Sequence, residues 1–226
     1  MKEVPVLTID GPSGSGKGTV SRAAAQTLGW ALLDSGALYR LVALAGRQAG
    51  VDLENAPELG RIAERFAIRF GSDRAGEEVV WLDGRDVTRE IRTESAGNDA
   101  SKVAALPLVR AALLERQRRF AVAPGLVADG RDMGTVVFPD AQVKIFLTAS
   151  ADERAVRRHK QLKEKGVAAT LAALSREIEE RDRRDITRSA SPLVASDDAV
   201  LLDTTGMPVD AVVGRVLEIV RERLSP

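Results

Sequence analysis

The chain has 226 residues, with 33 Lys and Arg against 33 Asp and Glu and no cysteine. The balanced charge gives no reason to expect nucleic acid or an anionic membrane as a partner, and the lack of cysteine excludes disulfides, thiolate nucleophiles and cysteine-ligated zinc. The length suits one α/β domain with an insertion, and because neither a signal peptide nor a membrane-spanning run is recognisable, we expect a cytoplasmic protein.

The first predicted elements are a strand, a glycine-rich loop and a helix. Residues 4–10 form an apolar run rich in β-branched side chains, and residues 20–28 repeat apolar side chains at helical spacing. Between them, Gly11, Gly16 and Lys17 have the spacing of a phosphate-binding loop, where backbone N–H groups converge on phosphate oxygens at a helix N-terminus. The sequence therefore predicts a triphosphate-binding loop here, to which Lys17 adds a positive charge.

One position of this loop departs from its commonest form. Gly18 stands where a serine or threonine hydroxyl usually contacts Mg²⁺, and Thr19 follows one residue later. We therefore expect the metal to be held by phosphates, water and outer-shell groups, for which Thr19 and Asp129 are candidates. No direct protein ligand is assigned.

The next elements continue the alternation of strand and helix. Residues 30–33 predict a short buried strand that ends at Asp34, and Ser35 can cap a helix over residues 37–48. Proteins of the α/β class keep their ligands at such strand ends. Arg40, one turn along this helix, is a candidate to meet an anionic ligand, although its spacing alone also fits a solvated surface arginine.

Residues 66–95 break the alternation. The apolar runs 66–70 and 78–82 are joined by a polar, glycine-containing segment and predict a β-hairpin. Two neighbouring strands without a helix between them do not belong to a series of βαβ units, so we expect residues 66–95 to form a lobe inserted into a parallel-sheet core. Helices are expected over residues 57–65, 100–105 and 108–120.

A second charged strand end lies in the middle of the chain. Residues 126–129 predict a buried strand that ends in Asp129, and Arg131 and Asp132 follow directly. A carboxylate at the end of a strand beside a phosphate-binding loop can order the Mg²⁺ shell, and Asp129 is placed for that role. An ordinary Asp-Gly turn would give the same residues. Residues 143–147 predict a further core strand.

The helix expected from residue 170 carries the most informative pattern outside the glycine-rich loop. One face of it forms a single stripe at spacings of three and four residues, made of Leu171, Leu174, Ile178, Arg181, Asp185 and Arg188. The first half of the stripe is apolar and the second half is charged. We expect the charged half to point into a polar cleft; the alternative is a helix end that projects into water. A strand over 199–203 and a helix over 209–224 follow.

Strands that alternate with helices behind a phosphate-binding loop predict an α/β fold in which helices cover a parallel β-sheet core and a triphosphate binds at the carboxyl ends of the strands. The chain lacks the Asn-Lys-x-Asp sequence with which GTPases read guanine, which argues against a GTP switch. A phosphotransferase needs a second anion site rich in cations, because the transferred phosphoryl group carries charge. Arginine suits this task, and the candidates are Arg40, Arg131, Arg154, Arg157, Arg158, Arg181, Arg184 and Arg188.

Four segments of the sequence resemble the bacterial cytidylate kinases: GPSGSGKGT at 11–19, LDSGALYR at 33–40, DGRDMGTVVFP at 129–139 and ERDRRD at 180–185. The resemblance runs from residue 4 to about residue 203. It implies a P-loop kinase fold that transfers a phosphoryl group from ATP to CMP or dCMP with the assistance of Mg²⁺, yielding ADP and CDP or dCDP. It also implies that residues 66–95 are a mixed α/β monophosphate-binding lobe and residues 152–166 a short helical lid.

The same resemblance implies roles for individual residues. The ATP phosphates would be bound by Gly11, Pro12, Ser13, Gly14, Ser15, Gly16, Lys17, Gly18, Thr19, Arg157 and Arg158. CMP would be bound by Asp34, Ser35, Arg40, Ser101, Arg110, Asp129, Arg131, Asp132, Arg181 and Asp185. Catalysis would depend on Lys17, Arg131, Arg181, Asp185 and Arg188.

The residues by themselves do not select cytosine, because serine, arginine and aspartate can hydrogen-bond many bases. A kinase that acts on UMP, AMP or shikimate would share the loop, and a regulatory P-loop ATPase would bind ATP but respond to a macromolecule. The balanced charge and the lack of a long partner-binding tail argue against the ATPase. We expect a monomer whose partners are small nucleotides, not nucleic acid or a membrane.

Overall fold

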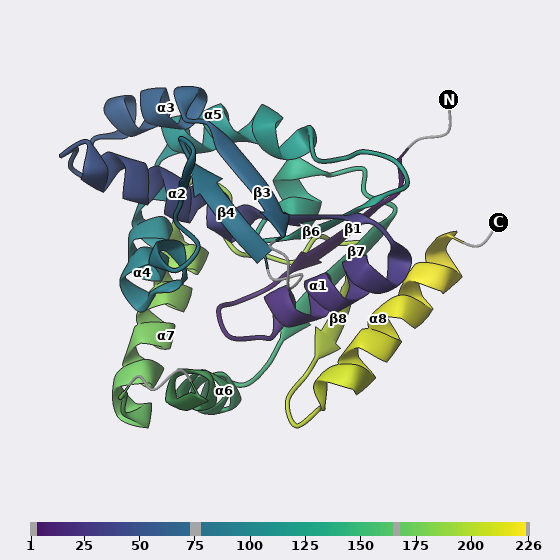
Figure 1. Cartoon of the computed structure of the whole chain (residues 1–226). Helices are drawn as coiled ribbons and strands as arrows, with labels where there is room; N and C mark the ends of the chain where they lie inside the picture. The colour runs from purple at the N-terminus through teal and green to yellow at the C-terminus, as the bar shows by residue number, and fades with distance from the viewer. Residues whose placement is uncertain (1–3, 73–77, 165–167, 225–226) are drawn as a thin grey trace. The chain divides into compact units, whose positions relative to one another are not determined.

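The computed structural model describes residues 4–72, 78–164 and 168–224 and divides into two compact units (Figure 1). The first unit contains the chain up to Asp34 and from Arg118 onward, and the second runs from Ser35 to Gln117. Residues 73–77 of the predicted hairpin turn and residues 165–166 of the predicted lid lie outside the described residues.

The first unit is built on a five-stranded parallel sheet with the order β2-β6-β1-β7-β8. Its strands are β1 (Val6–Asp10), β2 (Ala31–Asp34), β6 (Leu126–Asp129), β7 (Val143–Thr148) and β8 (Val200–Asp203). Every residue of β1 is buried, because this central strand has neighbours on both sides and covered faces. The predicted parallel sheet is confirmed.

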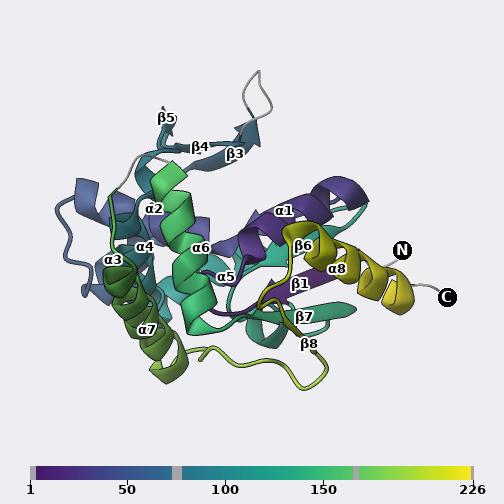
Figure 2. The ribbon, with the colours of Figure 1, turned by 90° about the horizontal axis from the view of Figure 1, so that it is seen from below.

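Two helices cover one face of this sheet. Helices α1 (Lys17–Leu28) and α8 (Val209–Leu224) lie side by side over it (Figure 2). Alternate strand residues such as Leu7 and Ile145 form an apolar core with Val20 of α1 and Val216 of α8, all four nearly inaccessible to solvent. The other residues of β1 therefore point to the opposite face, where Thr8 lies close to η2 (Met133–Val137), one turn of π-helix.

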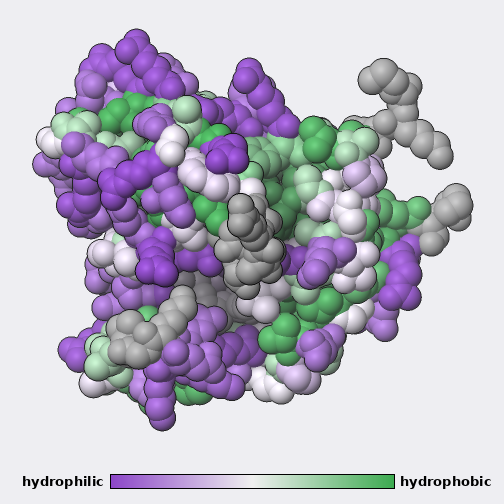
Figure 3. Space-filling model, in the orientation of Figure 1, coloured by the Kyte–Doolittle hydropathy of each residue, from purple (hydrophilic) through white to green (hydrophobic). Residues whose placement is uncertain are grey.

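The edge of the sheet is less well covered than its centre. Strand β8 pairs only with β7 among the described strands, and its residues alternate between partly buried and exposed. Figure 3 shows apolar side chains at the surface over β8 and α8, where Leu201 is 67% exposed and Val209 is 49% exposed. The remaining helices of this unit, α6 (Ala151–Glu164) and α7 (Leu171–Thr187), pack against each other.

The second unit combines four helices with a small antiparallel sheet. Its elements are α2 (Ser35–Gln48), α3 (Ala56–Arg65), β3 (Ile68–Ser72), β4 (Glu78–Leu82), β5 (Arg85–Asp86), η1 (Glu90–Arg92), α4 (Glu94–Val103) and α5 (Pro107–Arg118). Pairing of Ile68 with Leu82 in an antiparallel register confirms the predicted hairpin. Helix α2 packs against both α3 and α4.

Two helix starts in this unit differ from the prediction. Helix α4 begins earlier than residue 100, because the Thr93 hydroxyl accepts the N–H of Ala96 at 3.2 Å and caps the helix there. Ser35 is the first residue of α2 and not its cap. None of the helices in the described parts of the chain combines the length and the hydropathy that a bilayer span requires.

Candidate nucleotide-binding site

The glycine-rich loop joins β1 to α1 and has a backbone that favours glycine at three positions, Gly11, Gly14 and Gly16. Gly11 has φ +144°, and a Cβ there would lie 1.9 Å from the carbonyl oxygen of Leu147. Gly16 has φ +93° and stands immediately before the first turn of α1. The loop thus delivers its N–H groups to the N-terminus of a helix, the arrangement that binds phosphate.

Lys17 is the first residue of α1 and is buried. Its Nζ donates a hydrogen bond to the carbonyl of Pro12 at 2.8 Å, across the loop. Burial and the charge of Arg131 lower the pKa of Lys17, while the nearby Asp129, Asp10 and Asp185 oppose that shift. A bound phosphate would add negative charge beside Lys17 and favour its charged form.

Three aspartates end neighbouring strands at one edge of the sheet. In the parallel register Asp129 of β6 lies opposite Asp34 of β2 and Ile9 of β1, and Asp10 is the next residue of β1. Burial raises the pKa of Asp129, against the charges of Lys17 and Arg131. Asp129 Oδ2 lies 3.4 Å from the position that a Cβ on Gly18 would occupy, so this carboxylate faces the start of α1.

Asp10 is a site residue that the sequence analysis missed. Its two carboxylate oxygens accept the N–H of Met133 at 2.9 Å and the N–H of Gly134 at 2.8 Å. Burial raises its pKa to about 6, although these hydrogen bonds favour the charged form. The carboxylate thereby joins the end of β1 to the π-helical turn behind Asp132, and the available signal was a carboxylate directly before the glycine-rich loop.

The charged half of the predicted stripe on α7 does turn inward. Asp185 is buried and accepts a hydrogen bond from Arg131 Nε at 2.8 Å. Burial acts to raise the pKa of Asp185, but the charge and hydrogen bond of Arg131, with Arg188 and Arg181, lower it on balance. Arg188 Nη2 lies 4.0 Å from Asp132 Oδ1, and both side chains are buried.

The apolar half of that stripe is only partly as predicted. Leu174 and Ile178 are buried, but Leu171 is 46% exposed. Leu171 is the first residue of α7, where the helix has just begun and its neighbours do not cover it. The inward face of α7 therefore starts one turn later than the periodicity indicates.

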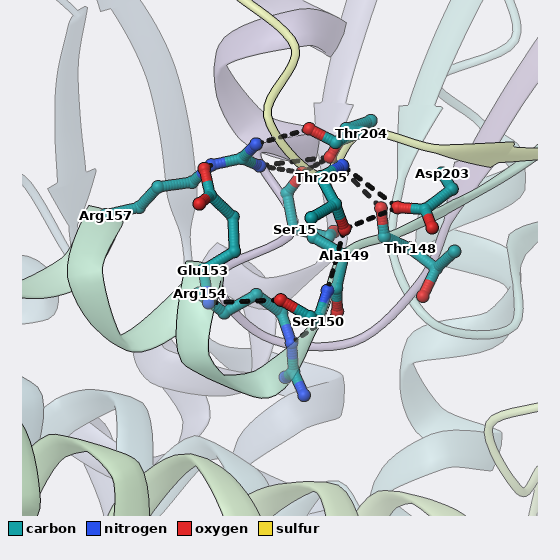
Figure 4. A network of polar contacts seen from close by, with 10 residues as sticks. All are labelled: Ser15, Thr148, Ala149, Ser150, Glu153, Arg154, Arg157, Asp203, Thr204 and Thr205. Atoms are coloured by element: carbon teal, nitrogen blue, oxygen red, sulfur yellow. Dashed lines mark hydrogen bonds and ion pairs between the residues drawn. The ribbon is translucent and has the colours of Figure 1, made fainter.

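Arg157 of α6 contacts protein groups of the glycine-rich loop and of the segment after β8 (Figure 4). Arg157 Nη1 donates to Thr204 Oγ1 at 3.0 Å and to the carbonyl of Ser15 in the glycine-rich loop at 3.4 Å. Thr204, which no sequence pattern indicated, is buried and itself donates to the Ser15 carbonyl at 3.3 Å. Arg158 Nη1 donates to Gln161 Oε1 at 3.0 Å, on its own helix.

Four of the predicted residues belong to the second unit. Ser35 is buried at the start of α2, and Arg40 Nη1 donates to the carbonyl of Ile91 at 2.8 Å. Arg110 Nη1 donates to the carbonyl of Ala104 at 3.1 Å. The hydroxyl of Ser101 is buried and has no hydrogen-bond partner among the described residues. A buried hydroxyl without a partner is costly unless a ligand satisfies it.

One family model and several known proteins are similar to this chain over almost its whole length. The family model of cytidylate kinase matches residues 7–222. A cytidylate kinase from Stutzerimonas stutzeri is 58% identical over 99% of this chain and 98% of its own. Those from Shewanella denitrificans and Shewanella frigidimarina are each 55% identical, over 99% and 98% of this chain and 99% and 97% of their own.

Proposed function

The chain belongs to the cytidylate kinase family, and we propose that it transfers the γ-phosphoryl group of ATP to CMP or dCMP, releasing ADP and CDP or dCDP. The observation that carries the proposal is a charged cluster in the first unit: Arg131, which follows β6, pairs with Asp185 of α7 at 2.8 Å, and both charges act on Lys17 of the glycine-rich loop. Two cations from distant segments, Lys17 and Arg131, are thus available to a phosphate bound at the loop.

On the donor side, the backbone N–H groups of residues 11–19 would hold the ATP phosphates. Lys17 would lie against the transferred group, and Arg157 and Arg158 would approach the phosphates from α6. Arg157 already contacts the carbonyl of Ser15 in this loop. A loosely bonded, highly charged transition state needs positioning and positive charge more than covalent participation by the protein.

On the acceptor side, the nucleophile is an oxygen of the CMP phosphate. Because that oxygen is already anionic, no side chain has to remove a proton from it. We assign the phosphate to Arg40, Arg131 and Arg181, the ribose to Arg181 and Asp185, and the cytosine to Ser101, Arg110 and Asp132. Asp34, Ser35 and Asp129 complete the proposed CMP site. Arg188 would stabilise charge on the transferred phosphoryl group.

Mg²⁺ fits the donor set beside the loop. Asp129 offers carboxylate oxygens next to Gly18, which has no side chain of its own to fill the space, and carboxylate oxygens suit this ion. Asp129 and Thr19 would contribute to its outer shell, and the bound ion would neutralise charge on the ATP phosphates. No group of three or more acidic or histidine side chains within the described residues is arranged to bind a metal directly.

We further propose that residues 66–95 serve as the monophosphate-binding lobe and residues 152–166 as a lid, and that the protein acts as a monomer. Exclusion of water by such elements favours transfer to CMP over hydrolysis of ATP. The lobe assigned from the sequence contains β3, β4, β5 and η1, within a compact unit that extends from Ser35 to Gln117.

The test is ADP release from ATP measured across a panel of acceptors. CMP and dCMP should give the highest kcat/KM, with UMP, AMP and shikimate well below them. A higher kcat/KM with AMP or shikimate would overturn the assignment. ADP release that needs no acceptor at all would indicate an ATPase.

A further inference from the structure

In a phosphate-binding loop the N–H groups face the ligand, and the carbonyl groups need hydrogen-bond donors from elsewhere. In a planar trans peptide the carbonyl and the N–H of the next residue point in opposite directions. A loop that turns successive N–H groups toward a ligand therefore turns carbonyls toward the protein, where they need donors. In this loop the carbonyl of Ser13 accepts a hydrogen bond from Arg154 Nη1 at 2.9 Å.

Arg154 lies in the first turn of α6 and is buried. All three of its guanidinium nitrogens donate to protein acceptors. Nε bonds the carbonyl of Ala149 at 3.1 Å, Nη1 bonds the carbonyl of Ser13, and Nη2 bonds Asp182 Oδ2 at 2.6 Å. Arg154, a candidate to offer its charge to the transferred phosphoryl group, thus has each of its guanidinium nitrogens engaged by the protein.

The contact with the loop involves packing as well as hydrogen bonding. A Cβ on Gly14 would lie 3.1 Å from the Cβ of Arg154, so the tip of the loop rests against the base of this side chain. Gly14 has φ +78°, a conformation that favours glycine. The peptide between Ser13 and Gly14 is thus held on one side by packing and at its oxygen by a cation.

Asp182 on α7 fixes the arginine. The side chains of Arg154 and Asp182 are only 7% and 17% exposed, so the ion pair is largely removed from solvent. Asp182 Oδ1 is buried and accepts no hydrogen bond from any described residue. A single carboxylate oxygen therefore determines where the third nitrogen of Arg154 points, and the planar guanidinium transmits that orientation to the Ser13 carbonyl.

We propose that Asp182 is a positioning residue for ATP binding. By holding Arg154 against the Ser13 carbonyl, it keeps the N–H of Gly14 on the phosphate side of the loop. The inference rests on the proposed function only in taking ATP as the ligand of the loop. Asp182 itself does not touch the nucleotide.

The test compares Asp182→Ala with Glu180→Ala, which removes a carboxylate from the same helix at an exposed position. ATP binding is measured by calorimetry in Mg²⁺ buffer without CMP, and KM is measured for both substrates. Asp182→Ala should weaken ATP binding and raise the KM for ATP by about 10-fold, the order expected for losing one charge-assisted hydrogen bond. The KM for CMP should stay within about 2-fold, and Glu180→Ala should match the wild type.

Two further variants guard against a general loss of folding. Asp182→Asn keeps the shape and one acceptor oxygen but removes the charge, so its ATP affinity should fall between those of the wild type and Asp182→Ala. Arg154→Lys keeps the charge but cannot reach three acceptors at once, so it should reproduce the defect of Asp182→Ala. In ¹⁵N spectra, the shift that ATP causes in the Gly14 amide should shrink in both Asp182→Ala and Arg154→Lys.

Wild-type ATP affinity in Asp182→Ala, or equal increases in both KM values, would overturn the inference. An unchanged Gly14 shift would do the same. Because calorimetry needs no acceptor, weaker ATP binding in Asp182→Ala would support the inference even if the wild-type protein failed to phosphorylate CMP. Failure of the proposed function would instead appear in the wild-type acceptor panel.

Discussion

Two carboxylates three residues apart on α7 pair with arginines from different parts of the chain. Asp182 pairs with Arg154 of α6 at 2.6 Å, and Asp185 pairs with Arg131, which follows β6, at 2.8 Å. Both carboxylates are mostly buried. Arg154 donates a hydrogen bond to the Ser13 carbonyl of the glycine-rich loop, and the charge of Arg131 acts on Lys17 of the same loop.

The pairs differ in what surrounds the arginine. The remaining nitrogens of Arg154 donate to two main-chain carbonyls, and the one of Ser13 belongs to the loop, so Arg154 holds the loop in place. Arg131 Nη1 donates to one main-chain carbonyl, that of Gly130 at 3.3 Å, and Arg131 belongs to a group of charged side chains in which Arg188 and Arg181 also act on Asp185. An Arg–Asp pair is therefore not enough to identify a ligand site; what the arginine contacts besides the carboxylate distinguishes the two pairs.

The largest effect is expected at Lys17, on which the charges of Arg131 and Asp185 act. Lys17→Ala removes the ammonium group from the loop and should lower kcat by about 10³-fold, the upper range for loss of one donor that stabilises transition-state charge. The measurement is ADP release with saturating CMP. Arg223→Ala, which removes a cation from an exposed position of α8, is the control. Turnover near that of the wild type in Lys17→Ala would contradict the role given to this residue.

The two Arg–Asp pairs can be told apart by removing each arginine in turn. Arg131→Ala should lower kcat/KM for CMP by about 10²-fold, since it would lose the proposed charged contact to the acceptor phosphate. It should also lower the free energy of unfolding by about 3 kcal/mol, because Asp185 is left buried without its partner. Arg154→Ala should lower the free energy of unfolding by a similar amount, but the kinetic parameter that it raises should be the KM for ATP. Identical kinetic defects in the two variants would erase the distinction between the pairs.

A smaller effect is expected at Asp132, the buried carboxylate 4.0 Å from Arg188. If it reads the base, Asp132→Ala should raise the KM for CMP by about 10-fold through loss of one hydrogen bond to a polar group. The KM for ATP should hardly change. Steady-state titration of each substrate at saturating concentrations of the other separates the two. An equal rise for both substrates would argue against base recognition.

The smallest effect concerns acid stability. The Arg131 charge and hydrogen bond hold the folded-state pKa of Asp185 below 3.8, its ordinary value, despite burial. A carboxylate whose pKa is lower in the folded state stabilises the fold at pH values above its unfolded-state pKa. That stabilisation is lost as the pH falls through the folded-state pKa. The stability advantage of the wild type over Asp185→Asn should therefore shrink from about pH 5 to about pH 3 in urea titrations. An advantage that grows toward low pH would refute the stated cause.

Local sequence determined the strand, loop and helix at the start of the chain and the periodicity of α7. The glycines of residues 11–16 and the run of apolar, β-branched residues in β1 are properties of single residues and their nearest neighbours. Such features can be predicted because they depend on backbone freedom and on spacing alone. The hairpin of β3 and β4 was predictable for the same reason, since its partners are close in the chain.

Only the tertiary structure decided which polar and charged groups contact each other. Residues as far apart in sequence as Asp10 and Gly134, or Ser15 and Thr204, form hydrogen bonds that no local pattern specifies. The arginines of α6 share one face of a helix, yet Arg154 braces the loop while Arg158 bonds along its own helix. The physical reason is that a side chain's partners depend on how distant segments pack, whereas its chemical capacity is set by its own residue type.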